Sequence, residues 1–161
     1  MEPSSTDDAA ALAGHASALA DAVEAALPGW VEASVERVLT DAGAQVAPEV
    51  AAAATAAGQR AVEEVGPAVR HLLSLDIDDQ RDTPLGLLRE AVRYPTEVLR
   101  RAGVRPIERD DFSRRSFPED DYDLTPANLG EVAPALAEAG LVWGAAKAHV
   151  HLARRREADG T

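Results

Sequence analysis

The chain has 161 residues, no cysteine and a formal net charge of −12, and its residues are 46% hydrophobic but only 4% aromatic. This length favours one domain, and the missing thiols exclude a disulfide framework, a thiolate zinc site and a cysteine nucleophile. The acidic balance argues against a protein that coats nucleic acid or an anionic membrane, because both need a cationic face.

The N-terminal sequence pattern predicts two helices joined by a short turn. Residues 1–8 are polar and acidic, and we expect them to form a disordered tail. The apolar residues that follow advance by three or four positions, as in a helix with one buried face, at Leu12, Ala16, Leu19, Val23 and Ala26. Pro28 and Gly29 should end this helix.

A second and a third helix are predicted before residue 76. The second runs from about Trp30 to Ala42, antiparallel to the first, and Gly43 should be its C-terminal cap. The third should be the longest, beginning at Pro48 and running to Leu75. Pro67 should kink it or divide it into two collinear helices.

Proline and glycine also mark the helices of the C-terminal part. Thr83 and Pro84 have the pattern of a capped helix start, and the pair Thr125 and Pro126 repeats it. Tyr94 followed by proline should break or bend the first of these helices. A long ordered loop should span about 104–125, pinned by its aromatic residues, and Pro134 should begin the last long helix.

These elements predict an all-α fold, an Ala-rich antiparallel bundle of about five to six helices. A single helical domain should cover 9–156, with acidic Ala-rich helices over 9–75, an Arg-rich part over 83–156, and a frayed tail over 157–161. No run of 18 apolar residues is free of charge, and the first eight residues are polar and acidic where a secretory signal would be basic and then apolar. We therefore expect a cytoplasmic protein without membrane contact.

Charge is distributed unevenly along the chain. Residues 1–79 hold 14 of the 28 acidic residues but only 3 of the 16 basic ones. The basic residues gather in an arginine belt, which we define as Arg81, Arg89, Arg93, Arg100, Arg101, Arg105, Arg109, Arg114 and Arg115. Guanidinium groups can capture phosphate, but the preferred interpretation is that the belt pairs with the acidic half of this chain or of a second copy.

No motif predicts a catalytic, cofactor-binding or metal-binding residue. The run from Asp78 to Asp82 resembles the DDxxD motif of prenyl-diphosphate and terpene synthases, but the second motif that those enzymes need is missing. It also fails as a calcium loop, because Arg81 stands where the turn requires glycine. His149 and His151 would point about 200° apart on a helix, so they cannot share one ion.

Two functional alternatives remain beside a non-enzymatic role. Three carboxylate pairs have a spacing of three residues, as in magnesium-dependent all-α nucleotide pyrophosphohydrolases: Asp79 with Asp82, Glu108 with Asp111, and Asp120 with Asp123. The belt from Arg89 to Arg101 could instead serve a DNA-associated regulator, against which the overall charge argues.

The preferred hypothesis is an interaction or regulatory protein that binds a protein partner or itself. Aromatic residues beside arginine are typical of binding hot spots, and the predicted contact residues are Phe112, Phe117, Tyr122, Trp143, Arg114 and Arg115. Small residues around Trp143, from Gly140 to Ala146, should leave a groove for another helix. No cofactor is expected.

Overall fold

A computed structural model describes residues 5–160, while residues 1–4 and 161 lie outside the described part. In chain order its elements are α1 (Ser5–Asp41), α2 (Pro48–Ser74), α3 (Pro84–Glu90), α4 (Arg93–Arg101), α5 (Asp111–Ser116), the 3-10 turn η1 (Leu129–Glu131) and α6 (Pro134–Asp159). Residues 5–160 contain no strand, so the predicted all-α class is confirmed.

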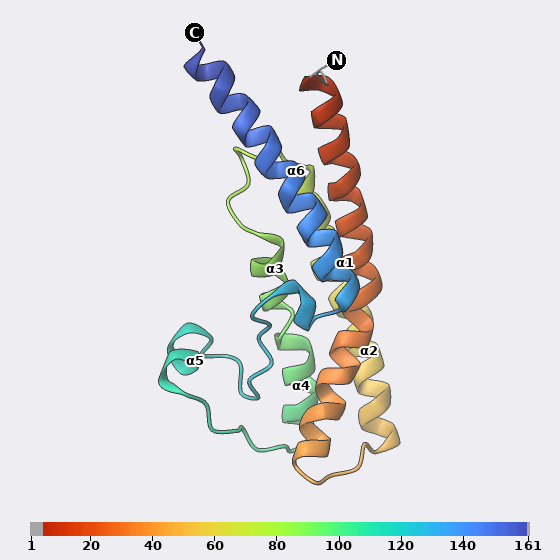
Figure 1. The fold of residues 1–161 in the computed structure, drawn as a ribbon. Coiled ribbons are helices and arrows are strands. Elements are labelled where there is room, and N and C mark those ends of the chain that lie inside the picture. The colour runs from red at the N-terminus through yellow and green to blue at the C-terminus, as the bar shows by residue number, and fades with distance from the viewer. Residues whose placement is uncertain (1–4, 161) are drawn as a thin grey trace.

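The three long helices form the body of the molecule (Figure 1). Helix α1 runs along the whole length of this body. Helix α2 returns antiparallel to α1, and α6 lies antiparallel to the N-terminal half of α1. Helices α3 and α4 pack on α2, and α5 projects from the body on a long connection. The N-terminal end of α1 and the C-terminal end of α6 therefore lie at the same end of the molecule.

Helix α1 corrects the prediction of two helices that meet at Pro28. It is one helix of 37 residues with Pro28 inside it. A proline in a helix interior costs about 3 kcal/mol. The continuous helix buries Leu27, Val31 and Val35 completely or nearly so, and each such side chain contributes roughly 1.5–3 kcal/mol. Packing on both sides of the proline therefore outweighs the lost hydrogen bond.

Helix α2 approaches α1 closely at this proline. A Cβ atom added to Gly58 would lie 3.0 Å from the Cα atom of Pro28, so only glycine fits there without a shift. Helix α2 has 27 residues and continues through Pro67. The prediction that it is the longest helix is wrong, because α1 did not end at Pro28.

The short helices follow the capping signals of the sequence. The Thr83 hydroxyl accepts a hydrogen bond from the backbone N–H of Gly86 at 3.0 Å, which confirms the predicted start of α3. The two helices are separated at Ala91 and Val92, so the break predicted at Tyr94 lies earlier in the chain, and Pro95 lies in the first turn of α4. A missing N–H costs little in a first turn. Gly103, with a φ of 79°, follows the end of α4.

The predicted loop over 104–125 is partly helical. Asp110 caps α5 by accepting a hydrogen bond from the backbone N–H of Ser113 at 2.7 Å. The second predicted helix start, at Thr125, is wrong, because the Thr125 hydroxyl donates to Asp120 at 2.6 Å and caps nothing. Asn128 instead caps η1, accepting from the N–H of Glu131.

Both predicted tails are shorter than expected. Helix α1 begins at Ser5, so the predicted disorder over 1–8 is wrong for 5–8, where Asp7 and Asp8 favour a helix N-terminus. Helix α6 continues to Asp159, so the predicted fraying is wrong for 157–159. Gly160 is the C-cap of α6, and the other residues of the predicted tails, 1–4 and 161, lie outside the described part. Within 5–160, every helix is too short or too polar to cross a membrane.

Candidate functional site

The main candidate site is an apolar groove at the end of the molecule where both termini lie. It has a volume of about 550 Å³ and opens to the surface between the N-terminal half of α1, the C-terminal end of α2 and α6. We call it the α1–α6 groove. Its apolar lining consists of Ala9, Leu12, Ala13, Ala16, Ala20, Leu73, Leu75, Ile77, Trp143 and Val150.

One wall is made almost entirely of small side chains, and the opposite wall holds an aromatic ring. The residues of α1 that line the groove, from Ala9 to Ala20, are alanines apart from Leu12 and Ser17. Across from them, Trp143 of α6 is 9% exposed. The Lys147 ammonium lies 5.0 Å from its ring centroid, so the indole is held in place by a cation–π contact as well as by packing.

Ion pairs form the rim on the α2 side. Arg70 of α2 lies 2.6 Å from Asp21 and 3.0 Å from Glu24 of α1. Both guanidinium hydrogen bonds raise the pKa of Arg70. Because its side chain is 41% exposed, Arg70 still presents its charge to the solvent above the groove.

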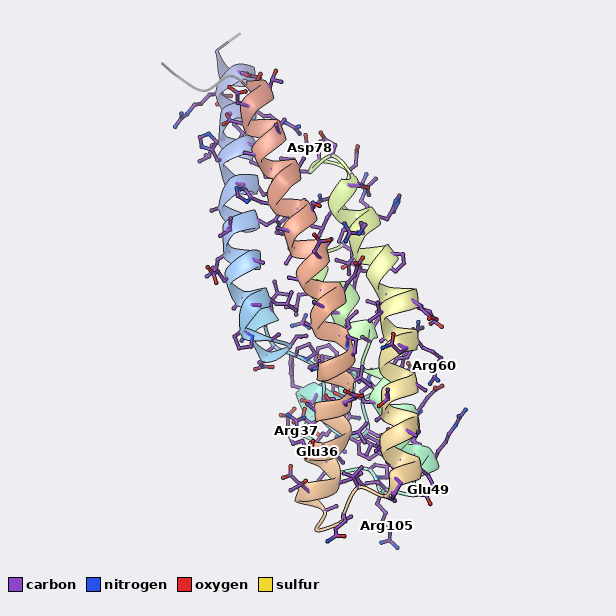
Figure 2. The ribbon with its side chains drawn as sticks, turned by 90° about the vertical axis from the view of Figure 1, so that its right-hand side faces the viewer. Glu36, Arg37, Glu49, Arg60, Asp78 and Arg105 are labelled. Atoms are coloured by element: carbon purple, nitrogen blue, oxygen red, sulfur yellow. The ribbon has the colours of Figure 1, made fainter. Side chains whose placement is uncertain are left out.

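A second group of ion pairs fixes the C-terminal half of α6. Arg154 lies 2.8 Å from Asp76 and 2.7 Å from Asp78, in the loop after α2. The hydrogen bond from Arg154 holds the pKa of Asp76 well below its usual range, with a contribution from the backbone N–H of Asp78. Figure 2 shows Asp78 in this loop, at the end of the molecule where the groove opens.

The two histidines of α6 lie on different sides of the helix, as their spacing predicted. The Nε2 atom of His149 is 3.4 Å from a carboxylate oxygen of Asp8 in α1. The Nδ1 atom of His151 is 3.8 Å from Asp78. The two side chains thus link α6 to opposite borders of the groove, and they share no common ligand position.

The structure separates the residues that were predicted to form one contact surface. Trp143 lies in the groove, whereas Phe112 is 73% exposed on the projecting α5. Tyr122 is 1% exposed, and its hydroxyl donates to the carbonyl of Val104 at 2.7 Å, so it is a core residue and not a contact residue. Phe117 is half-buried beneath the Arg89 guanidinium, 5.6 Å from the ring centroid.

The two arginines of the predicted surface lie on α5, away from the groove. Arg114 pairs with Asp111 one turn earlier on the same helix, and Arg115 is exposed. The groove beside Trp143 was predicted from the small residues around it. None of these small residues, Gly140, Gly144, Ala145 and Ala146, lines the α1–α6 groove, so that part of the prediction is wrong. Leu129 of η1 packs against Gly140.

Much of the arginine belt stabilises the fold. Arg89 donates to the carbonyl of Pro126 at 3.1 Å, Arg93 to Glu64 at 3.0 Å, and Arg100 to Asp121 at 2.6 Å. Of these, only the Arg93 contact reaches the acidic half of the chain. The other two fasten the long connection after α4 to the body of the molecule.

Sequence reasoning missed the role of Asp120. It is 3% exposed, and its carboxylate accepts hydrogen bonds from the N–H groups of Tyr122, Leu124 and Thr125 and from the Thr125 hydroxyl. All the donors lie within five residues, a local pattern typical of aspartate in turns. Within the described range 5–160, no group of three or more His, Asp or Glu side chains is arranged to hold a metal ion.

Comparison of the chain with known proteins found no match. No protein-family model matches the chain, and neither a curated protein nor a solved structure matches it.

Proposed function

We propose that this chain is a protein-interaction module whose α1–α6 groove receives the apolar face of a helix from a partner protein. The observation that supports this most strongly is the groove itself: an open apolar channel of about 550 Å³ with an aromatic side chain on one wall. Grooves of this kind bind amphipathic helices through side chains at positions i, i+3, i+4 and i+7.

The dimensions and lining of the groove favour a helix as the occupant. From Ala9 to Ala20 the α1 wall extends about 16 Å, which corresponds to three helical turns. Alanine side chains on this wall let a second helix approach to the short interaxial distances of about 8 Å at which small residues pack. Trp143 supplies the large, fixed ring that anchors many interfaces.

The charges around the groove indicate the character of the partner. Carboxylates of Asp21, Glu24, Asp76 and Asp78 border it, together with Asp8 at the end of α1. The two arginines at this border, Arg70 and Arg154, each form an ion pair with one of these carboxylates. The rim is therefore acidic overall, and it complements a helix whose polar face carries Lys or Arg.

The experiment uses two synthetic amphipathic peptides of about 18 residues, with the same leucine face and either lysine or glutamate on the polar face. Trp30 and Trp143 are the two tryptophans of the chain, so Trp30→Phe leaves Trp143 as the reporter in the groove. The lysine peptide should shift the Trp143 emission with a micromolar dissociation constant. The affinity of the glutamate peptide should be lower by about tenfold or more.

A matched pair of substitutions locates the binding site. Ala13→Arg places a cation in the groove, and Ala11→Arg places the same cation on the far side of α1; both alanines are exposed. The first should weaken the lysine peptide by about tenfold, and the second should change little. The proposal is wrong if neither peptide shifts the Trp143 emission, or if both substitutions act equally. Binding of a small apolar dye that the lysine peptide cannot displace would also contradict it.

A further inference from the structure

The outer face of α6 carries an apolar stripe that no other element of the described chain covers. Leu141 and Leu152 are 76% and 52% exposed, and Val142 beside them is 44% exposed. Leu136, Trp143 and Val150 are the buried residues of the same helix and lie on its opposite face. Figure 2 shows α6 at one flank of the molecule, with α1 on its inner side.

The spacing of this stripe is that of a helix–helix seam. Leu141, Ala145, Ala148 and Leu152 advance by 4, 3 and 4 positions, so they fall within about 60° of one another around the helix axis. Such spacing is typical of two helices that pack along their length. The other large apolar side chains exposed in 5–160 are Val46, Ile107 and Phe112, and these lie in loops or on α5 without any such repeat.

Charged residues at the two ends of the stripe have opposite signs. Glu138 stands three residues before Leu141, and Arg155 and Arg156 stand three and four residues after Leu152. All three charged side chains are exposed, and none forms an ion pair with another residue between 5 and 160. Along this face an acidic side chain thus precedes the apolar stretch and two basic side chains follow it, before Asp159 at the end of the helix.

This order of charges is complementary to itself when a second copy is turned around. In an antiparallel pair, Leu141 of one copy is level with Leu152 of the other, and Ala145 with Ala148. Glu138 of one copy then lies beside Arg156 of the other, with Arg155 at the same height. A parallel pair would place glutamate on glutamate and arginine on arginine, which is repulsive. The small alanines at the centre let the helix axes approach closely.

We propose that the chain forms a two-fold symmetric dimer through the outer faces of two antiparallel α6 helices. Glu138 to Arg155 spans about 25 Å, so the contact is one helix wide and belongs to the class of interfaces below about 1,200 Å². The dimer is therefore reversible, with a dissociation constant that is micromolar or weaker. It leaves the α1–α6 groove open on the opposite side, and it does not depend on the function proposed for that groove.

Disulfide trapping tests the orientation directly. Because the chain has no cysteine, Leu141→Cys and Leu152→Cys each introduce a single thiol. Mixed under mild oxidation, the two variants should cross-link to each other about tenfold more than either does to itself. In an antiparallel pair a thiol at 141 lies about 16 Å along the axis from its own copy, beyond the reach of a disulfide.

A control variant measures the background level of cross-linking, and two outcomes would contradict the proposed dimer. Ala18→Cys, on an exposed position of α1, gives the level of cross-linking by random collision. Self-cross-linking of each α6 variant would show a parallel pair and overturn the proposal. A mixed yield no higher than the Ala18→Cys level would overturn the interface itself.

Charge reversal tests the ends of the stripe by sedimentation equilibrium from about 5 to 500 µM protein. Glu138→Arg should weaken the dimer by about fivefold or more, because each symmetric interface then holds two sets of like charges. Combining it with Arg155→Glu and Arg156→Glu should restore the affinity to within about threefold of the original. Unchanged dimerisation of Glu138→Arg, or a mass that stays at 16.9 kDa throughout, would overturn the proposal.

Leu141→Asp separates this inference from the function proposed for the groove. This variant should be monomeric at every concentration, and its affinity for the lysine peptide should be unchanged. A fully dimeric Leu141→Asp would contradict the interface, whereas failure of every peptide to bind would contradict only the groove proposal.

Discussion

The same substitution, glycine to alanine, should have opposite effects at two positions of the long helix pair. Gly14 of α1 and Gly58 of α2 both lie in helix interiors, where alanine is favoured by about 1 kcal/mol. Around Gly14 no atom lies within 4 Å of the position of an added Cβ. Gly14→Ala should therefore raise the free energy of unfolding by about 0.5–1 kcal/mol.

At Gly58 the steric cost exceeds this gain. The added Cβ would lie 3.0 Å from the Cα, 3.1 Å from the carbonyl oxygen and 3.4 Å from the Cβ of Pro28. Carbon atoms pack best about 3.5–4.0 Å apart, so the two helices would have to separate by roughly half an ångström. Overpacking of this kind costs about 1–3 kcal/mol. After subtraction of the helix propensity, Gly58→Ala should lower the free energy of unfolding by up to about 2 kcal/mol.

The assay is urea unfolding followed by circular dichroism, with the wild type and both variants at one protein concentration, because self-association would make stability depend on concentration. The two midpoints should move in opposite directions around that of the wild type at an unchanged slope. If Gly58→Ala proves as stable as Gly14→Ala, the close approach of α2 to Pro28 is refuted.

Three further predictions concern the long connection and the rim of the groove. Asp120→Ala should lower the free energy of unfolding by about 3 kcal/mol, because it leaves buried donors without an acceptor; urea melts measure this loss. Tyr122→Phe should cost about 1 kcal/mol in the same assay, whereas Phe112→Ala should change stability by less than about 0.5 kcal/mol. Arg154 lowers the pKa of Asp76, so the resulting stabilisation is present above about pH 4 and is lost as the pH falls through the folded-state pKa. The urea midpoint of Asp76→Asn should consequently fall less than that of the wild type between about pH 5 and pH 2.

The course of α1 shows where local sequence signals mislead. Pro28 and Gly29 indicate a helix end when only neighbouring residues are considered. The apolar stripe, however, continues in phase across them, from Val23 through Leu27 to Val31. Two separate helices joined by a turn would have no need to keep that phase. Packing on α2 keeps α1 continuous through Pro28. The sequence signal that indicated this continuity was the unbroken spacing of the apolar residues.

The sequence predicts the individual walls of the candidate site but not how they come together. The stripe of α1 and the position of Trp143 on a seam of α6 were both visible in the sequence, because each follows helical spacing. Their juxtaposition depends on the antiparallel docking of α6 on α1, which no local pattern specifies. For the same reason, Tyr122 and Phe112 have similar local contexts but opposite fates, one 1% and the other 73% exposed.

Helix α6 lines the groove with one face and exposes apolar side chains on the other. A helix that is apolar on more than one face is normally covered on each of them, yet residues 5–160 cover only the face of α6 that holds Trp143 and Val150. The ion pairs of Arg154 with Asp76 and Asp78 fix the same helix at the border of the groove. Its outer face is thereby presented on a rigid support. The groove face and the outer face lie on opposite sides of α6, so a substitution on either one tests that surface alone.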